Sequence, residues 1–206
     1  MKILVLGATG NVGKHFIQQS NGKGHTIHAV VRKPVTAEGI NYIQGNVFDA
    51  GVLSDILTKG NYDAVVNLLG GGLTKSTVLT ESTRLVVDAL SGKSSTRYVG
   101  ISVLTLMPKT IPGHITAFIL SNTFLRHVDR DHHGALESLK TSSLDWTMVA
   151  CGQIVEGAGG AVLKRANRFT GGYRQIQMGD VANEIWRELE MPDHHKCVFG
   201  VWSVVK

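Results

Sequence analysis

The sequence predicts a Rossmann-like α/β fold, a doubly wound parallel sheet with helices on both faces. Two observations predict it. Short apolar runs alternate with amphipathic stretches along most of the 206 residues. The first apolar run, residues 2–6, leads directly into glycines at 7, 10 and 13. Because crossovers between parallel strands are right-handed, the carboxyl ends of the strands meet at one edge of the sheet, where we expect a ligand to bind.

The glycine spacing after the first strand is typical of a dinucleotide-binding turn. Gly7 allows a sharp turn, Gly10 lets backbone approach a phosphate, and Gly13 lets the following helix pack against the strand. Free N–H groups at residues 10–13 and the positive end of the helix dipole would face the pyrophosphate. The alternative is an ordinary strand-to-helix turn built from small residues. The position directly after a strand at the N-terminus favours cofactor binding.

The remaining elements follow from periodicity and turn residues. Strands are expected at 25–31, 41–47, 62–69, 97–103 and 145–150, and helices at 50–59, 76–90 and 121–141. After Cys151 the alternation breaks, and the sequence predicts a hairpin of short strands at 161–165 and 173–176, a helix at 180–190 and a last strand at 197–205. No linker is evident, so we expect one domain over 1–206, with residues 151–206 forming a cap on the substrate side.

Composition narrows the possible partners. The formal net charge of +5 indicates anionic partners, but Lys and Arg are scattered and only 6% of residues are aromatic, which argues against nucleic-acid binding. No apolar run reaches the length of a membrane span and the first is too short for a signal peptide. We therefore expect no membrane partner and a cytoplasmic location. Cys151 and Cys197 are expected as reduced thiols, Cys151 as a small buried apolar residue.

The end of the second strand distinguishes the two nicotinamide cofactors. A carboxylate there would accept hydrogen bonds from a ribose hydroxyl and favour NAD, whereas cations would pair with the extra phosphate of NADP. The chain has Arg32 and Lys33 there, and no carboxylate before Glu38. Arg32 can bind phosphate with two parallel hydrogen bonds. The alternative is a pair of solvated loop cations, and NADP(H) is the expected cofactor.

Two further strand ends add contacts at the same edge. Asn46 is placed to hydrogen-bond the adenine edge, and Val47 to pack on the ring. Gly70, after the fourth strand, would let backbone approach the second ribose. Each of these is an ordinary strand end when taken alone.

Six motifs spread over nearly the whole chain form a recognisable set: Gly-Ala-Thr-Gly-Asn-Val-Gly at 7–13, Val-Val-Arg at 30–32, Gly-Asn-Val at 45–47, Val-Val-Asn-Leu-Leu-Gly at 65–70, Leu-Glu-Ser-Leu-Lys-Thr-Ser-Ser-Leu-Asp-Trp-Thr at 136–147, and Gly-Asp-Val-Ala at 179–182. With these motifs the chain resembles the atypical short-chain dehydrogenases that include NmrA-like proteins. Within that group it is most similar to NADPH-dependent flavin reductases and biliverdin-IX-beta reductases.

The resemblance implies roles for further residues. Thr9, Asn11 and Val12 would join the glycines at the pyrophosphate, and Arg32 would hold the 2′-phosphate. Asn46 and Val47 would contact adenine, although these families usually have Asp where Asn46 stands. Leu69 and Gly70 would border the ribose. Ser102 would lie beside the nicotinamide and His132 near the mouth of the site. These two are the expected catalytic residues.

Departures from the pattern bear on the reaction. The Tyr-x-x-x-Lys pair of ordinary short-chain dehydrogenases is missing, because Tyr98 precedes Ser102 and Tyr173 precedes Gln177 at that spacing. The flavin and biliverdin reductases usually have a second hydroxyl where Val103 stands and a histidine where Gln153 stands. A flavin or quinone needs little acid catalysis from protein, since water can supply the proton.

We therefore expect an NADPH-dependent reductase that passes hydride to a flavin, a quinone or a similar flat conjugated acceptor. The alternative is an NmrA-like protein that senses NADP(H) without turnover, which Val103 and Gln153 favour. A sugar-nucleotide epimerase agrees less well, because such enzymes generally keep the tyrosine–lysine pair and a longer C-terminal domain.

Two other features remain open at this point. Asp-His-His occurs at 131–133 and at 193–195, but the spacing matches no metal-ligand signature and we expect no metal. The apolar residues 115–120 and 124–125 could be core, the wall of a substrate cleft or a dimer face. The chain is expected as a monomer or a homodimer.

Overall fold

A computed structural model describes residues 1–33, 35, 39–92, 95–123 and 125–204. These residues form an eight-stranded sheet in the order β3-β2-β1-β4-β5-β6-β10-β8, and every neighbouring pair except β10–β8 is parallel. Its strands are β1 (Lys2–Leu6), β2 (Thr26–Val31), β3 (Ile40–Gln44), β4 (Ala64–Asn67), β5 (Arg97–Val103), β6 (Asp145–Cys151), β8 (Leu163–Ala166) and β10 (Cys197–Ser203). The predicted fold class is confirmed.

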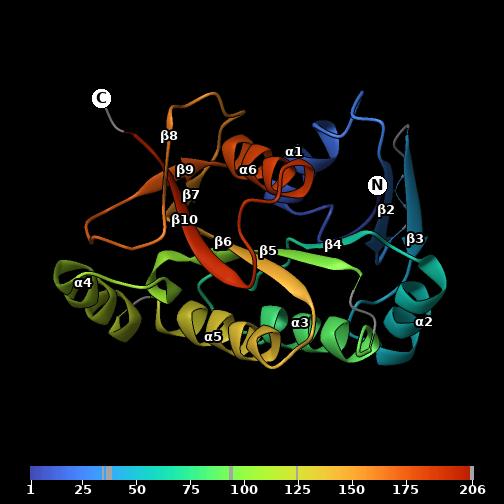
Figure 1. The fold of residues 1–206 in the computed structure, drawn as a ribbon, viewed down its shortest axis with the longest axis horizontal. Coiled ribbons are helices and arrows are strands. Elements are labelled where there is room, and N and C mark those ends of the chain that lie inside the picture. The colour runs from blue at the N-terminus through green and yellow to red at the C-terminus, as the bar shows by residue number, and fades with distance from the viewer. Residues whose placement is uncertain (34, 36–38, 93–94, 124, 205–206) are drawn as a thin grey trace.

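The helices cover both faces of this sheet. They are α1 (Asn11–Gln18), α2 (Ala50–Gly60), α3 (Val78–Ala89), α4 (Ile111–Asn122), α5 (Arg126–Lys140) and α6 (Met178–Glu190), with a 3₁₀ turn, η1, at Leu104–Leu106. Figure 1 shows α1 and α6 on one face and α2, α3 and α5 on the other, with α4 at one end. No helix among the described residues is long and apolar enough to cross a membrane.

Each face of the sheet has its own apolar core. Ile3 and Val5 of β1 pack on the α1–α6 side, where the rings of Phe16 and Trp186 stack with centroids 4.2 Å apart. Leu4 and Leu6 point the other way, toward α2, α3 and α5. This alternation, with both sides apolar, is what a central parallel strand requires.

The chain after Cys151 differs from the sequence prediction. The predicted hairpin is wrong, because β8 pairs antiparallel with β10, and β9 (Gln175–Gln177) pairs in parallel with β7 (Gln153–Val155). Without β8, the largely buried strand β10 would be the edge of the sheet; pairing with β8 satisfies its backbone groups on that side. Strand β10 belongs to the main sheet and helix α6 packs beside α1 on one of its faces (Figure 1). After Cys151, only β7, β9 and the adjoining loops therefore lie outside the main sheet and its helical layers.

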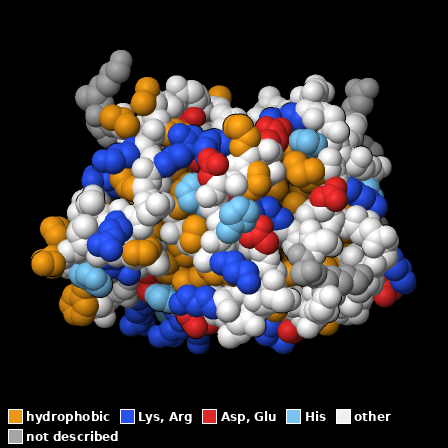
Figure 2. All heavy atoms as spheres, viewed as in Figure 1, with side chains coloured by type: hydrophobic (Ala, Val, Ile, Leu, Met, Phe, Trp, Pro, Cys, Tyr) orange, Lys and Arg blue, Asp and Glu red, His pale blue; other side chains and the backbone are white. Residues whose placement is uncertain are grey.

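Helix α4 was not assigned from the sequence, although its start carries a recognisable signal. The Thr110 hydroxyl accepts a hydrogen bond from the Gly113 N–H at 3.4 Å, and Pro112 lies in the first turn. Apolar side chains gather on the outside of this helix, at the left edge of the molecule in Figure 2. Ile115, Phe118 and Ile119 are therefore not core, whereas Ala117 is buried.

A buried ion pair anchors the opposite end of the sheet. Arg97, at the start of β5, donates to the Glu188 carboxylate at 2.8 Å, to the Thr147 hydroxyl at 2.8 Å and to the His194 carbonyl at 2.7 Å. It also pairs with Asp145 of β6. The Glu188 side chain has no exposed surface, and Arg97 is 11% exposed. Arg97 thus joins β5, β6, α6 and the loop before β10.

We expect Arg97→Met to lower the free energy of unfolding by about 3–5 kcal/mol, because it leaves the Glu188 carboxylate buried without its main partner. Urea unfolding of both proteins measures the difference. Arg84→Met is the matched control: Arg84 forms an exposed pair with Asp88 on α3, and its loss should cost about 0.5 kcal/mol or less. Equal effects of the two substitutions would contradict the structural role of Arg97.

Candidate cofactor site

The turn between β1 and α1 has the geometry that the glycine spacing predicts. Gly7 adopts φ +85°, a conformation that side chains disfavour, and its carbonyl accepts the Gly10 N–H at 3.0 Å. A Cβ on Gly7 would also lie 2.8 Å from the Leu68 carbonyl carbon. Two separate constraints therefore require glycine at this position.

Gly13 lets α1 approach this turn closely. A Cβ there would lie 2.1 Å from the Gly7 carbonyl oxygen and 2.7 Å from the Ala8 carbonyl carbon. Gly10 begins the helix without a capping side chain, and the first turn contains no acidic residue. The backbone N–H groups at Asn11 and Val12 and the positive helix end are therefore available to an anion. Thr9 is exposed beside them.

The sheet register brings the other candidate residues to the same edge. Leu6, the last residue of β1, pairs with Val30 of β2 and with Asn67 of β4. The residues that follow those strands, 32–33 and 69–70, therefore lie beside the glycine turn. Val31 pairs with Gln44 and Asn67 with Gly100, which adds Asn46 and Ser102 to this edge.

Arg32 and Lys33 are exposed directly after β2. Neither forms an ion pair with any residue in the described part of the chain. Glu38, the first carboxylate after them, lies outside the described residues. Both cations are thus available to a phosphate at this edge.

Asn46 and Val47 differ in accessibility. Asn46 is exposed, and its Oδ1 accepts the Phe48 N–H at 3.2 Å, which leaves the Nδ2 group to face outward. Val47 is 7% exposed and packs in the apolar core. Phe48, which the sequence analysis did not single out, is 37% exposed in the same turn and offers a ring face.

A buried polar network that the sequence did not reveal shapes the loop after β4. Asn67 has no exposed surface; its Nδ2 donates to Ser82 at 2.9 Å and its Oδ1 accepts the Leu69 N–H at 3.2 Å. No atom lies within 4 Å of where a Gly70 Cβ would be, so the space there is open. The sequence signal that could have revealed this network is the asparagine at the end of the apolar strand β4.

Polar contacts of Asp131 and Thr105 fix the start of α5, the helix that carries His132. The Asp131 carboxylate caps α3, accepting the N–H groups of Leu79 at 3.1 Å and Thr80 at 2.8 Å. Thr105, three residues after Ser102, donates to Asp129, three residues before His132. The start of α5 is thereby tied to the end of β5.

Ser102 and His132 each carry a buried polar atom without a hydrogen-bond partner among the described residues, Oγ in Ser102 and Nδ1 in His132. Ser102 is 1% exposed. Burial lowers the pKa of His132 to about 4, although the carboxylates of Asp131 and Asp129 oppose this shift. The imidazole is therefore neutral at pH 7. Unpaired buried groups of this kind fit a polar ligand such as a carboxamide.

The tyrosines do not supply the missing acid–base pair. Tyr98 is fully buried, and its hydroxyl is bonded to Thr83 at 2.9 Å. Burial raises its pKa to about 12. The exposed Tyr173 donates to the side-chain oxygen of Gln153, across β7 and β9. Burial also raises the pKa of the Cys151 thiol, as expected for a buried apolar residue.

The two Asp-His-His segments serve structural contacts. Asp131 caps α3, and His133 lies 3.7 Å from Asp129. In the second segment, His194 contacts Glu188 at 2.9 Å and His195 contacts Asp145 at 3.0 Å. No cluster of three or more His, Cys, Asp or Glu suited to a metal occurs in the ranges that the structure describes.

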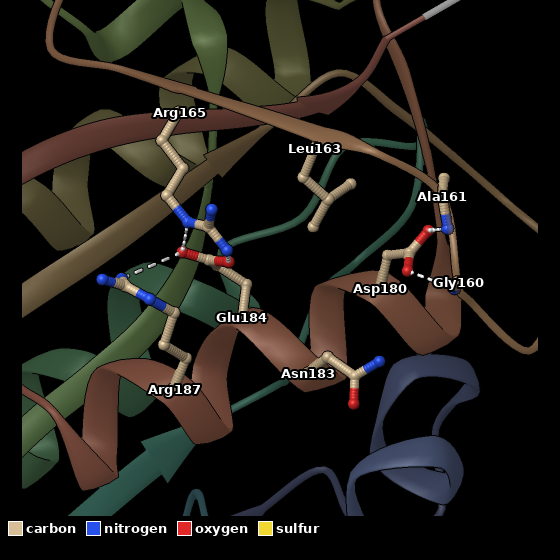
Figure 3. A pocket seen from close by; sticks show the side chains of 8 residues that line it. All are labelled: Gly160, Ala161, Leu163, Arg165, Asp180, Asn183, Glu184 and Arg187. Carbon is tan, nitrogen blue, oxygen red and sulfur yellow. Dashed lines mark hydrogen bonds and ion pairs between the residues drawn. The ribbon is translucent and has the colours of Figure 1, made fainter.

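A cavity of about 380 Å³ lies between β8 and α6 (Figure 3). Its charged groups are already paired. Arg165 binds the buried Glu184 carboxylate with two hydrogen bonds of 2.7 and 2.6 Å, and Asp180 accepts the Gly160 N–H at 2.7 Å. None of its lining residues comes from the glycine turn, so this cavity is separate from the cofactor edge.

A parallel sheet whose first turn presents an uncapped helix end, next to unpaired cations, defines a dinucleotide-binding Rossmann protein. Comparison with known families agrees. Residues 7–192 match the NAD(P)H-binding family model, and the chain belongs to that family.

Solved structures with the same fold include several reductases. A candidate NADH-flavin reductase of Streptococcus pneumoniae TIGR4 is similar with a TM-score of 0.84 and 22% identity, over 99% of this chain and 100% of that one. ChuY, an anaerobillin reductase of Escherichia coli O157:H7, has a TM-score of 0.81 and 20% identity, over 100% and 99%. A short-chain dehydrogenase/reductase of Veillonella parvula DSM 2008, in complex with NADP, has a TM-score of 0.75 and 19% identity, over 98% and 94%.

We expect Gly13→Ala to lower the free energy of unfolding by about 2 kcal/mol or more and to abolish nucleotide binding, because the new methyl group forces α1 away from the turn. Urea unfolding and calorimetric titration with NADPH measure both effects. Gly51→Ala on α2 is the control; its Cβ meets only the Asp49 carboxylate, at 3.4 Å, and should be neutral or slightly stabilising. Wild-type stability and binding in Gly13→Ala would contradict the geometry.

The His132 pKa also predicts how stability depends on pH. Between about pH 6.5 and pH 4 the unfolded chain binds a proton at His132 that the folded chain does not, so stability falls as the pH is lowered through this window. When the pH is lowered from about 7.5 to about 4.5, the free energy of unfolding of the wild type should fall by about 1–3 kcal/mol more than that of His132→Gln. Urea unfolding at both pH values measures this, and equal losses in His132→Gln and wild type would contradict it.

Proposed function

We propose that this protein is an NADPH-dependent reductase that passes hydride to a flavin, a quinone or a similar flat conjugated acceptor. The observation that carries the proposal is the turn between β1 and α1, where the close approach of Gly13 to Gly7 aims an uncapped helix end at the ligand edge. Membership of the NAD(P)H-binding family supports a nicotinamide cofactor.

The residues of this edge fit NADP(H). Gly7, Gly10 and Gly13, with Thr9, Asn11 and Val12, hold the pyrophosphate. Arg32 binds the 2′-phosphate with its guanidinium and Lys33 adds charge, since neither has another partner in the described ranges. The NADP complex of a protein with the same fold supports this choice.

The adenosine and nicotinamide ends have separate partners. Asn46 and Val47 contact the adenine, and Leu69 and Gly70 border the second ribose. Ser102 offers its unpaired hydroxyl to the nicotinamide end. When bound, the cofactor supplies the hydride, and the chain positions the two rings.

The side chains near Ser102 favour an acceptor that takes its proton from water. The neutral imidazole of His132 can hydrogen-bond and orient an acceptor, but at pH 7 it is not the imidazolium that would serve as a general acid. Tyr98 is bonded within the core. Two proteins with the same fold, the candidate NADH-flavin reductase and the anaerobillin reductase ChuY, support a reductase with an acceptor of this kind.

A second candidate function is a sensor that binds NADP(H) without turnover. The contact between Tyr173 and Gln153 favours it, because it occupies the position where the resembled reductases have a histidine. Such a protein would bind the cofactor tightly and release or recruit a partner as the cofactor is oxidised.

The test follows the loss of NADPH absorbance with a panel of flavins and quinones. We expect turnover with NADPH, and Arg32→Ala should weaken NADPH binding about 10–100-fold while leaving NADH binding unchanged, since NADH lacks the 2′-phosphate. Arg84→Ala, an exposed arginine on α3, is the control. Tight NADPH binding without oxidation above background would replace the reductase by the sensor, and binding of neither nucleotide would reject both.

A further inference from the structure

Helix α4 exposes its large apolar residues, whereas a surface helix usually turns such residues toward the core. Its buried positions are the small residues Gly113 and Ala117. Large side chains face outward at spacings of four, three and one residues, which places them on one stripe: Ile111 (80% exposed), Ile115 (60%), Phe118 (70%) and Ile119 (55%). We call these four residues the α4 stripe.

Contacts with the loop before β9 hold α4 in this orientation. A Cβ on Gly113 would lie 2.1 Å from the Phe169 carbonyl oxygen, which itself accepts the Thr110 N–H at 3.1 Å. Thr116 accepts the Gly172 N–H at 3.4 Å on the same side. The helix cannot rotate its stripe inward without breaking these contacts, so the apolar face is built to point outward.

The surroundings of the α4 stripe are mainly basic. Residues 104–128 and 157–179 contain no Asp or Glu. The next carboxylate along the chain, Asp129 of α5, is mostly buried and accepts the Thr105 hydroxyl. Lys109 and Arg168 flank the contact with Phe169, and Arg126 begins α5 directly beyond α4. None of these three cations forms an ion pair with any residue the structure describes. Figure 2 shows Lys and Arg side chains beside the apolar group at this edge.

We propose that the α4 stripe docks this protein on an anionic lipid surface. Apolar side chains that project from one helix face, with Lys and Arg around them, insert at the boundary between headgroups and acyl chains. Anionic headgroups attract the flanking cations. A lipid surface also accepts a projecting helix without a preformed groove.

Charge disfavours a second copy of the chain as the partner. A two-fold contact through the α4 stripe would bring Lys109, Arg126 and Arg168 of both copies to one interface, and like charges there weaken association. The sequence-based expectation of no membrane partner rested on the length of apolar runs. A surface contact through one helix face needs no such run.

Co-sedimentation with lipid vesicles tests the proposal on the full chain, independently of any reductase activity. We expect binding to vesicles of equal parts phosphatidylglycerol and phosphatidylcholine, none to phosphatidylcholine alone, and a decrease as sodium chloride is added. The double substitution Ile115→Ser and Phe118→Ser should lower binding at least about tenfold. Substituting Lys109→Gln and Arg168→Gln together should weaken binding to the anionic vesicles.

Met191→Ser is the matched control, because Met191 is 58% exposed after α6, outside the α4 stripe. It should bind vesicles like the wild type, and unchanged melting temperatures would show that the variants fold. Absent binding to anionic vesicles, or equal binding to both kinds, would overturn the proposal. So would a dimer seen by light scattering that the Ile115/Phe118 double substitution dissociates, because a second copy would then cover the stripe.

Discussion

The structure depends on the close contact between the turn after β1 and the first helix. A side chain at Gly13 would collide with the Gly7 carbonyl oxygen, so α1 can lie against β1 only with glycine at that position. This contact directs the N-terminal end of α1 to the carboxyl edge of the sheet, beside the ends of β2 and β4. In the proposed function, backbone N–H groups and the helix dipole bind phosphate at that edge, and Arg32 and Lys33 add charge.

Buried polar groups position the rest of the edge. Asn67 closes the turn after β4, and Asp131 of α5 caps α3, which joins two helices on the same face of the sheet (Figure 1). At the other end of the sheet, Arg97 joins β5, β6 and α6 through Glu188 and Asp145. Arg97 pairs with both carboxylates, and only the Nε of Arg97 has no hydrogen-bond partner among the described residues of this group. Ser102 and His132 each keep one buried unpaired atom, and we propose that these atoms are available to a ligand.

Most elements up to β6 followed from local patterns, because strands such as β1 and β4 contain short apolar runs and Gly7 marks a turn by itself. Helix α4 did not follow from such a pattern. The family and the position of the glycine turn at the carboxyl edge of the sheet were predictable for the same reason. The pairing of β8 with β10 was not predictable, because a four-residue strand contains no signal for its partner. Strand β10 begins 31 residues after β8 ends (166 to 197). The contacts of Asn67 with Ser82 and of Asp131 with α3 also join residues far apart in the chain, and no spacing rule predicts them.

The sequence by itself determined the class of fold, the glycine turn and the cations after β2, because each depends on residues within a few positions of one another. Tertiary structure alone decided which polar groups are satisfied and which apolar residues are covered. Asp131 proved to be a helix cap, His132 a neutral imidazole, and the apolar residues of α4 an outward stripe. Burial is a property of all the elements packed around a residue, so periodicity within one helix cannot specify it.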